Sequence, residues 1–373
     1  MIVRELKPDP AQPIAPGGSA LTGADAHPLP SSSPPHLPLW RGAVSQRTRD
    51  LAWCSLSPML LSRLPDEYQA GAARLARWPT GARNAWQAWL AQADPALLPE
   101  TIAELSGHPD PTGSRSLRLG RHAERLLHFA LQHGTGIELL AVNVPIRRAN
   151  GHGVQTLGEL DVVWRDPAAS ETVHWEMAAK FYLMVEGTVD RRAFVGPNLV
   201  DRLGDKLDHI VRRQLPLGRT AEAQAIVGQP VHRSEVYLLG WLFYRDGVVP
   251  AGLDALGIAP DHQHGWWSTL DAWSGWAVEH EKHGVRWCRL PRVDWLSGAR
   301  VAEADTECAA TLRETLRQRF ADPHQAWRRE APVMICELEP AGPAEPGIWI
   351  ERSRGFVVPP GWESKAHARA AEP

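Results

Sequence analysis

Two carboxylates and a lysine stand out in a stretch of the chain that is otherwise largely apolar. The segment 157–183 reads LGELDVVWRDPAASETVHWEMAAKFYL and contains Asp161, Glu176 and Lys180. Mg²⁺ prefers oxygen ligands and is commonly held by one or two carboxylates together with substrate phosphate. A lysine beside such a pair can orient a water molecule or balance the charge of the phosphate. Together these residue types indicate metal-dependent cleavage of a phosphodiester bond.

The residues around the three side chains predict two β-strands, 157–164 and 172–184, which the short connection RDPAASE makes antiparallel neighbours. Side chains alternate along a strand, so a register that pairs Asp161 near Glu176 puts both carboxylates and Lys180 on one face. The apolar residues between them then face the core. An alternative is a buried ion pair between Lys180 and Glu176, with Asp161 capping a turn.

A third carboxylate lies on the helix predicted for 114–133, SRSLRLGRHAERLLHFALQH, where Glu124 falls on the apolar stripe. An ion pair with Arg121 or His128, three and four residues away, would account for a charge at this position. The other interpretation is that Glu124 points toward the acidic residues of the two strands.

A basic line follows on the next predicted helix. The segment 199–215 reads LVDRLGDKLDHIVRRQL and comes directly after Asn198, a residue type that caps helices. Four basic residues recur beside its apolar stripe, namely Arg202, Lys206, His209 and Arg213. Such a line can hold backbone phosphates without reading their sequence. Taken alone, such a line is more often an ordinary solvated helix face.

Composition limits the classes of protein to consider. The 373 residues carry a formal net charge of −3, so nucleic acid would have to be bound by a local patch rather than by a global basic field. The four cysteines form no CxxC pair or Cys/His cluster, which argues against a zinc site and a disulfide framework and favours a cytoplasmic protein with reduced thiols. We find no apolar run of signal-peptide or membrane-spanning length, and we expect no membrane partner. Most of the 17 tryptophans are expected to be buried or half-buried.

The changes in pattern along the chain predict five regions of a mixed α/β (α+β) protein. These are a disordered Pro-rich arm (1–40), a helical N-terminal region (41–108), a core (109–245), an α+β C-terminal portion (246–362) and a disordered tail (363–373). In the core, a helix is followed by three strands, a second helix and a buried strand over 234–244. This is an α-β-β-β-α-β order.

That order resembles the core of the PD-(D/E)XK nuclease superfamily, which has a restriction-endonuclease-like fold, and GELDVVWRD is similar to its GEIDLI-type second strand. A longer set of segments, from about position 44 to 362, resembles the bacterial domain of unknown function 1853 family. These segments are RDLAWCSLSPMLL, LGRHAERLLHFAL, GELDVVWRD, HWEMAAKFYL, FVGPNLVDRLGDKLDHIVRRQL and GFVVPPGW.

The resemblance implies a nuclease that uses Mg²⁺ or Mn²⁺ and acts on nucleic acid, with DNA favoured over RNA. Asp161 and Glu176 would be metal ligands, Lys180 the catalytic lysine and Glu124 an accessory acid of the metal site. The sequence departs from the family motif at Ala178, which stands where Glu-X-Lys has lysine, although Lys180 stays on the same face.

Two other functions fit these residues. One is a catalytically inactive protein of the same fold that binds nucleic acid or acts as a scaffold. The other is a two-carboxylate hydrolase acting on sugars, which is disfavoured because a neighbouring lysine suits phosphate better.

Overall fold

Strands from both halves of the chain join one sheet. The structure is a computed structural model, and it describes residues 43–69, 73–92, 119–134, 136–151, 153–185, 189–324 and 329–373. The strands of this part of the chain are β1 (Ala73–Leu75), β2 (Glu138–Asn150), β3 (Gly153–Asp166), β4 (Glu171–Met184), β5 (Phe194–Val195), β6 (Arg233–Arg245), β7 (His264–Thr269), β8 (Arg286–Arg289), β9 (Arg300–Ala302), β10 (Val333–Pro340) and β11 (Ile348–Val358).

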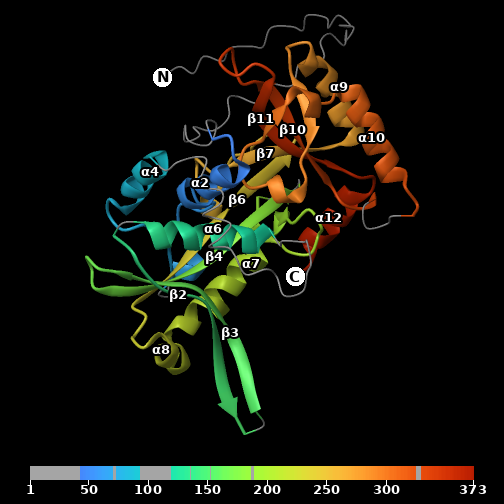
Figure 1. Ribbon diagram of the computed structural model, residues 1–373. Coiled ribbons are helices and arrows are strands. Elements are labelled where there is room, and N and C mark those ends of the chain that lie inside the picture. Colours follow the sequence, from blue (N-terminus) through green and yellow to red (C-terminus); the bar gives the residue numbers. More distant parts are fainter. Residues whose placement is uncertain are drawn as a thin grey trace, which may run out of the picture.

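The helices cover this sheet and connect its strands (Figure 1). They are α2 (Gln46–Leu56), α3 (Asp66–Gln69), α4 (Ala82–Gln92), α6 (Leu119–His133), α7 (Leu203–His209), α8 (Ala221–Val227), α9 (Leu270–Glu281), α10 (Ala309–Ala321) and α12 (Trp362–Ala371). A π-helical turn, η2 (Ile210–Gln214), and a 3-10 turn, η3 (Leu215–Arg219), continue α7. The predicted mixed α/β class is therefore confirmed. In the described part of the chain, no helix combines the length and the apolar character needed to cross a membrane.

The sheet has the order β2-β3-β4-β6-β7-β11-β10-β8, with β1, β5 and β9 paired at its margins. Strands β2, β3 and β4 are antiparallel neighbours, and β6 lies parallel to β4. Parallel neighbours need a crossover connection, and the segment from α7 to α8 supplies it. From α6 onward the chain forms β2, β3 and β4, and then β5, α7, η2, η3 and α8 before it enters β6.

The two faces of this part of the sheet pack against different helices. Val162 and Trp164 of β3 belong to the cluster of buried side chains that contains residues of α2 and α6. Val163, between them, packs in a separate cluster with Leu217 of η3 and Ala223 of α8. Because consecutive side chains of a strand point to opposite faces, α6 and the η3–α8 segment cover opposite faces of the sheet.

The sheet continues without interruption across position 245, the predicted boundary between the core and the C-terminal portion. Strand β7 pairs in parallel with both β6 and β11. Helices α9 and α10 cover this half around a second apolar cluster that includes Trp266, Trp273 and Trp287. Tryptophans are thus mainly core residues, since eleven of those described are buried.

Two predictions about the chain need correction, and others concern residues outside those described. The segment 363–373, predicted to be a disordered tail, contains most of helix α12, because Trp362 and Ala366 are buried against the rest of the protein. The basic helix begins at Leu203, not after Asn198. The predicted arm 1–40, the last part of the helical N-terminal region and positions 114–118 lie outside the described residues.

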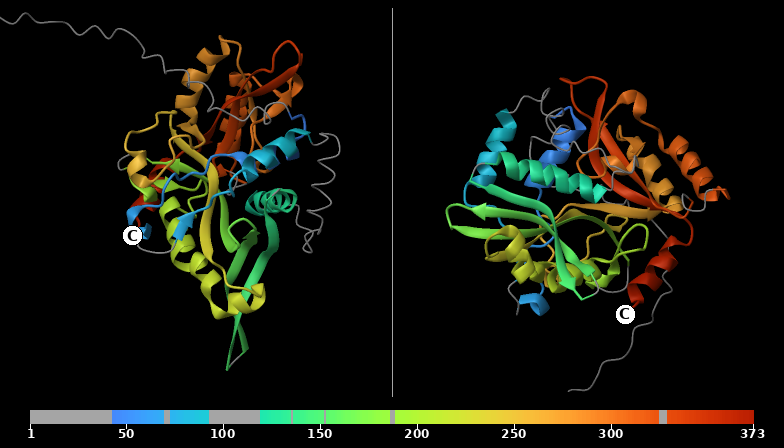
Figure 2. Two further views of the ribbon diagram at one scale, coloured as in Figure 1. Left: turned by 90° about the vertical axis from the view of Figure 1, so that its left-hand side faces the viewer. Right: turned by 60° about the horizontal axis from the view of Figure 1, so that its bottom comes forward.

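A two-stranded ribbon projects from the body, as Figure 1 and the left view of Figure 2 show. Strand β3 pairs with β4 only from Val162 to Asp166, whereas its pairing with β2 continues to Gly153. We call residues 146–151 and 153–158 the β2–β3 arm.

Candidate functional site

Asp161 and Glu176 lie side by side where β3 and β4 separate. The last residue pair of these strands is Val162–Trp175, and Asp161 and Glu176 are the next residue on each strand. Beyond that pair, the backbone N–H of Met177 donates a hydrogen bond of 2.9 Å to Oδ2 of Asp161. The side chain of Asp161 thus accepts a bond from the backbone of the neighbouring strand. The predicted register therefore brings the two carboxylates together.

Glu176 is almost fully buried, with 2% of its surface exposed. Its Oε1 atom accepts a hydrogen bond of 3.2 Å from Nε2 of Gln214, on η2. Its Oε2 atom has no hydrogen-bond partner among the described residues. Nε2 of His174 is 3.8 Å from that oxygen, which is too long for a hydrogen bond. The carboxyl group of Glu176 also interacts with that of Asp161. Oε2 of Glu176 therefore lies beside a second carboxyl group and receives no N–H donor from the described residues.

Glu124 joins the two strand carboxylates from α6. Burial, followed by repulsion from Asp161 and Glu159, raises its pKa to about 7. No ion pair links Glu124 to Arg121 or His128 within the described chain. Burial lowers the pKa of His128 to about 4, and Nε2 of its ring has no hydrogen-bond partner among the described residues. We call Glu124, Asp161 and Glu176 the carboxylate cluster.

The other two members of the carboxylate cluster are also shifted toward the protonated form. Burial is the main cause for Asp161, whose pKa is raised to about 6. For Glu176, burial and the neighbouring charge of Asp161 raise the pKa to about 8. Carboxyl groups that are desolvated next to one another resist ionisation, so the carboxylate cluster favours any cation that can enter it.

Two lysines lie near the carboxylate cluster, and they are held differently. Lys180 donates a hydrogen bond of 2.6 Å from Nζ to Oδ2 of Asp201, so its ion pair is with Asp201 and not with Glu176. Lys206, on α7, is the lysine whose charge lowers the pKa of both Asp161 and Glu176. Burial in turn lowers the pKa of Lys206. The sequence indicates Lys206 only as one position of a basic line. It does not show that this side chain is partly buried next to the carboxylate cluster.

The basic line predicted on this helix does not form one surface. Arg202 is buried and donates to both carboxylate oxygens of Asp205, at 2.7 and 2.9 Å. It also donates to backbone oxygens of the α12 end of the chain, including Arg369 O at 3.1 Å. His209 and Arg213 are exposed on the outer side of the helix. Only Lys206 of the four therefore acts on the carboxylate cluster.

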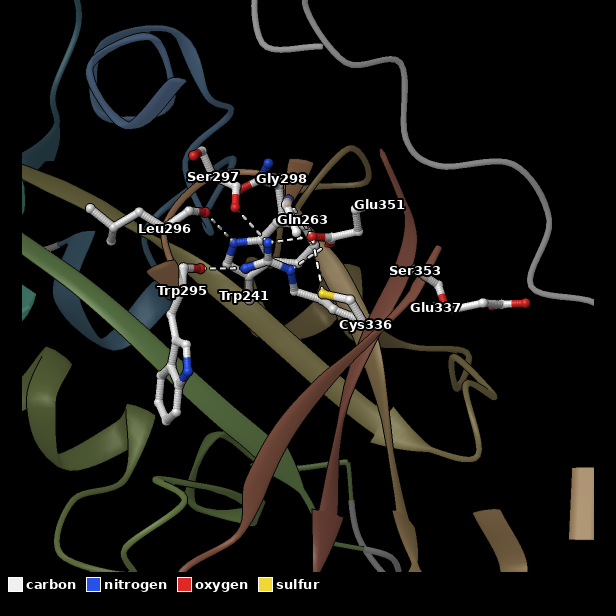
Figure 3. Close-up of polar contacts among 12 residues, drawn as sticks. Trp241, Gln263, Trp295, Leu296, Ser297, Gly298, Cys336, Glu337, Glu351 and Ser353 are labelled. Carbon is white, nitrogen blue, oxygen red and sulfur yellow. Dashed lines mark hydrogen bonds and ion pairs between the residues drawn. The ribbon is translucent and has the colours of Figure 1, made fainter. Parts of the chain in front are cut away.

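A second set of buried charges lies at the junction of the N-terminal helices and the C-terminal strands (Figure 3). Arg354 donates to Oε1 and Oε2 of Glu351, with both distances 2.6 Å, and to the backbone oxygen of Ser297 at 2.5 Å. The Sγ atom of Cys336 donates to Glu351 Oε2 at 3.2 Å. Asp50 of α2 accepts a hydrogen bond of 2.6 Å from the hydroxyl of Ser297. We call Asp50, Ser297, Glu351 and Arg354 the Arg354 cluster.

A hollow of about 860 Å³ lies apart from the carboxylate cluster, between α10, α12 and β8. Two of its charged side chains are already paired, Arg289 with Glu307 at 3.0 Å and Lys365 with Glu330 at 2.9 Å. Its walls contain none of the residues of the carboxylate cluster. The hollow is therefore separate from the acidic site.

The donor atoms of the carboxylate cluster suit a hard cation. In the described part of the chain, no three His, Cys, Asp or Glu side chains form a ready-made metal cage. Mg²⁺ does not require one, because it commonly keeps several water ligands and takes only one or two carboxylates from the protein. The unpartnered oxygen of Glu176, beside Asp161, matches that requirement.

Comparison with known proteins identifies a family. A family model with the description "Domain of unknown function (DUF1853)" matches residues 49–358. No curated protein and no solved structure matches the chain.

Proposed function

This chain belongs to the DUF1853 family, and we propose that it is a metal-dependent nuclease that hydrolyses nucleic-acid phosphodiester bonds at the carboxylate cluster. One observation carries the proposal: three carboxyl groups from α6, β3 and β4 are gathered where no arginine of the described residues forms an ion pair with them, and the pKa of each is raised. Buried like charges are costly, and perturbed pKa values of this kind concentrate at functional sites.

The arrangement of elements supports the same proposal. A helix, three antiparallel strands, a crossover helix and a parallel strand follow one another from α6 to β6. This is the arrangement expected for a restriction-endonuclease-like core, in which the second and third strands carry the acidic residues. A fold hosts many functions, so the proposal rests on the site rather than on the topology.

Asp161 and Glu176 would hold Mg²⁺ or Mn²⁺. A bound ion of this kind polarises a phosphodiester, stabilises the extra charge of its transition state and lowers the pKa of a bound water molecule. Oε2 of Glu176 would give the ion an oxygen that has no other partner among the described residues. Gln214 holds the other oxygen of Glu176 and so fixes the direction in which the carboxylate points.

Lys206 would supply the positive charge that balances the substrate phosphate. Its charge already acts on Asp161 and Glu176, whereas Lys180 is engaged by Asp201. A fixed cation in a partly water-excluded site stabilises developing negative charge more strongly than one in bulk water. Glu124 would complete the acidic set from α6 and accept a hydrogen bond from a water molecule between the three carboxyl groups.

A non-catalytic nucleic-acid-binding protein is the second candidate. The observation that favours it is the displaced lysine: Ala178 stands at the motif position, and Lys180 is paired with Asp201. A protein that retained the fold and lost catalysis would be free to lose that lysine. Catalysis and binding therefore need to be measured separately.

The proposal is tested by incubating the protein with single-stranded, double-stranded and branched DNA and with RNA, in Mg²⁺, Mn²⁺ or EDTA. We expect Asp161→Asn to abolish metal-dependent cleavage and Lys206→Met to reduce it by about 100-fold, the scale for removing one group that stabilises the transition state. Lys180→Met should retain most of the activity. Asp254→Asn, at an exposed carboxylate on a turn far along the chain, is the matched control. The same residual cleavage in wild type and Asp161→Asn would exclude a nuclease site here, and metal-independent binding without cleavage would favour the second candidate.

A further inference from the structure

The β2–β3 arm has the form of an isolated ribbon. Strand β4 does not extend along it, because the pairing of β3 with β4 stops at Val162. Nearly all of its described positions beyond Ile146 are exposed, and Val154 is 71% exposed. The ribbon extends well beyond the body of the protein (Figure 1 and the left view of Figure 2).

The charge of the arm differs from that of the whole chain. The sequence from 146 to 158 contains two arginines and no aspartate or glutamate, whereas the protein carries a net charge of −3. Arg147 and Arg148 are consecutive on β2 and so point to opposite faces of the ribbon. Nε of Arg148 is 2.6 Å from Oε1 of Glu222, but its side chain is 54% exposed. An exposed pair of this kind contributes little and can be exchanged for a phosphate contact.

The base of the arm is fixed to the body of the protein. Ile146, Leu160 and Leu217 share an apolar cluster with Ala223 of α8. Gly158 lies so close to η3 that a Cβ atom at this position would be 2.4 Å from Cδ1 of Leu217. Close packing at the base sets the direction of the ribbon before any partner arrives, which reduces the entropy that binding must overcome.

The arm and the carboxylate cluster share strand β3. Gly153, at the end of the arm, is eight residues from Asp161, so the arm reaches roughly 25 Å from the cluster by the strand rise. The major groove of B-form DNA is about 12 Å wide and admits a two-stranded β-ribbon. The major groove of A-form RNA is too narrow and deep for side chains to enter.

We infer that the β2–β3 arm enters the major groove of double-stranded B-form DNA and places the duplex against the carboxylate cluster. Arg147 and Arg148 contact the phosphates on either side of the groove. The inference deepens the proposed function by naming duplex DNA as the partner. It depends on that function only for the cutting of the bound duplex, since binding can be measured without catalysis.

The test is binding of fluorescently labelled duplex DNA in EDTA, followed by anisotropy over a series of salt concentrations. We expect Arg147→Glu/Arg148→Glu to weaken binding at least tenfold and to lower the salt slope by about 0.9 for each phosphate that is no longer neutralised. The matched control is Arg313→Glu, an exposed arginine of α10 in the C-terminal half, which should bind as wild type does. Asp161→Asn should also bind normally, so a failed nuclease assay and a failed arm are distinguishable.

A second variant removes the end of the arm without changing its base. Residues 149–154 are replaced by Asn-Gly, which forms a two-residue hairpin turn between Arg148 and Gln155. A cooperative thermal unfolding transition like that of wild type would establish that this variant is folded. We expect it to lose binding to duplex DNA and to bind duplex RNA as wild type does. Two results would overturn the inference. One is that the double-arginine variant binds duplex DNA as tightly as wild type does, and the other is that wild type binds duplex DNA and duplex RNA with equal affinity.

Discussion

The carboxylate cluster and the Arg354 cluster both remove carboxyl groups from water, with opposite electrostatic results. Burial alone would raise the pKa of Glu351, but the guanidinium of Arg354 outweighs burial and lowers it. In the carboxylate cluster, burial and mutual repulsion raise the pKa of Glu176 to about 8. A buried carboxylate that is paired with a guanidinium can stay charged in the folded protein. A buried carboxylate without such a partner is stabilised in its charged form when a cation binds.

The difference lies in the partners that each fold region provides. Arg354 makes a two-pronged contact with Glu351, a geometry that satisfies both carboxylate oxygens. Glu176 receives one amide donor, from Gln214, and its second oxygen receives none among the described residues. Most buried polar atoms in folded proteins are satisfied. Oε2 of Glu176 is one of several that have no partner among the described residues, and its position beside the carboxyl group of Asp161 is what indicates a cation as its ligand.

The largest expected effect is that of breaking the matched cluster. Arg354→Met leaves the buried carboxylate of Glu351 without its cation, and removing one partner of a buried ion pair costs about 3–5 kcal/mol. We expect that loss in the free energy of unfolding measured by urea titration. Arg317→Met, which breaks the exposed pair with Glu314 on α10, is the control and should cost well under about 1 kcal/mol. Equal losses in the two variants would show that burial of Arg354 does not matter to stability.

Replacing a buried glutamate by glutamine should change the stability of the protein in opposite directions in the two clusters. In metal-free protein the raised pKa of Glu176 means that the folded state holds a proton that the unfolded chain releases above its ordinary pKa of 4.5. Stability from this group is therefore lost as the pH rises from about 4.5 to about 8, and Glu176→Gln removes that loss. At about 1.4 kcal/mol for each pKa unit, we expect Glu176→Gln to stabilise the protein by up to about 4 kcal/mol at pH 8 and to have little effect near pH 4.

Glu351→Gln is the matched comparison and should destabilise the protein at pH 8, because it removes a charge that Arg354 needs. Unfolding midpoints in EDTA at several pH values give both results in one experiment. If both variants shifted stability in the same direction, the contrast between the clusters would fail.

The smallest expected effect concerns Lys180, which belongs to neither cluster. Its pair with Asp201 is partly exposed, with 32% and 38% of the side chains accessible. Exposed pairs contribute about 0.2–1 kcal/mol, so a double-mutant cycle of Lys180→Met and Asp201→Asn should give a coupling within that range. A coupling above about 3 kcal/mol would place Lys180 among the buried charges instead.

The sequence predicts the strand carboxylates because their signal is local. Alternation along two short, consecutive strands is enough to place Asp161 opposite Glu176, and the structure has the predicted register. The position of Glu124 on an apolar stripe carries the same kind of information. The positions of these residues can therefore be predicted from the sequence on either side of them.

Long-range contacts account for what the sequence does not predict. Asp50 and Ser297 of the Arg354 cluster are 247 positions apart, and no local pattern joins them. Helix α12 has a polar sequence that suggests a tail, but the indole of Trp362 donates to the backbone oxygen of Pro197. The start of α7 differs from the prediction for a related reason: Arg202 is bound by the α12 end of the chain, and Leu199 has a φ of +58°, which a helix does not allow.

The central claim is that the carboxylate cluster is a site for a divalent cation, and calorimetric titration of Mn²⁺ into metal-free protein at pH 7 tests it most directly. We expect wild type and Arg313→Glu to bind, and Asp161→Asn to lose binding. Because Glu176 holds a proton at this pH, binding should also release protons, which makes the measured heat depend on the ionisation enthalpy of the buffer. Absence of binding by wild type, or equal binding by Asp161→Asn, would contradict the account.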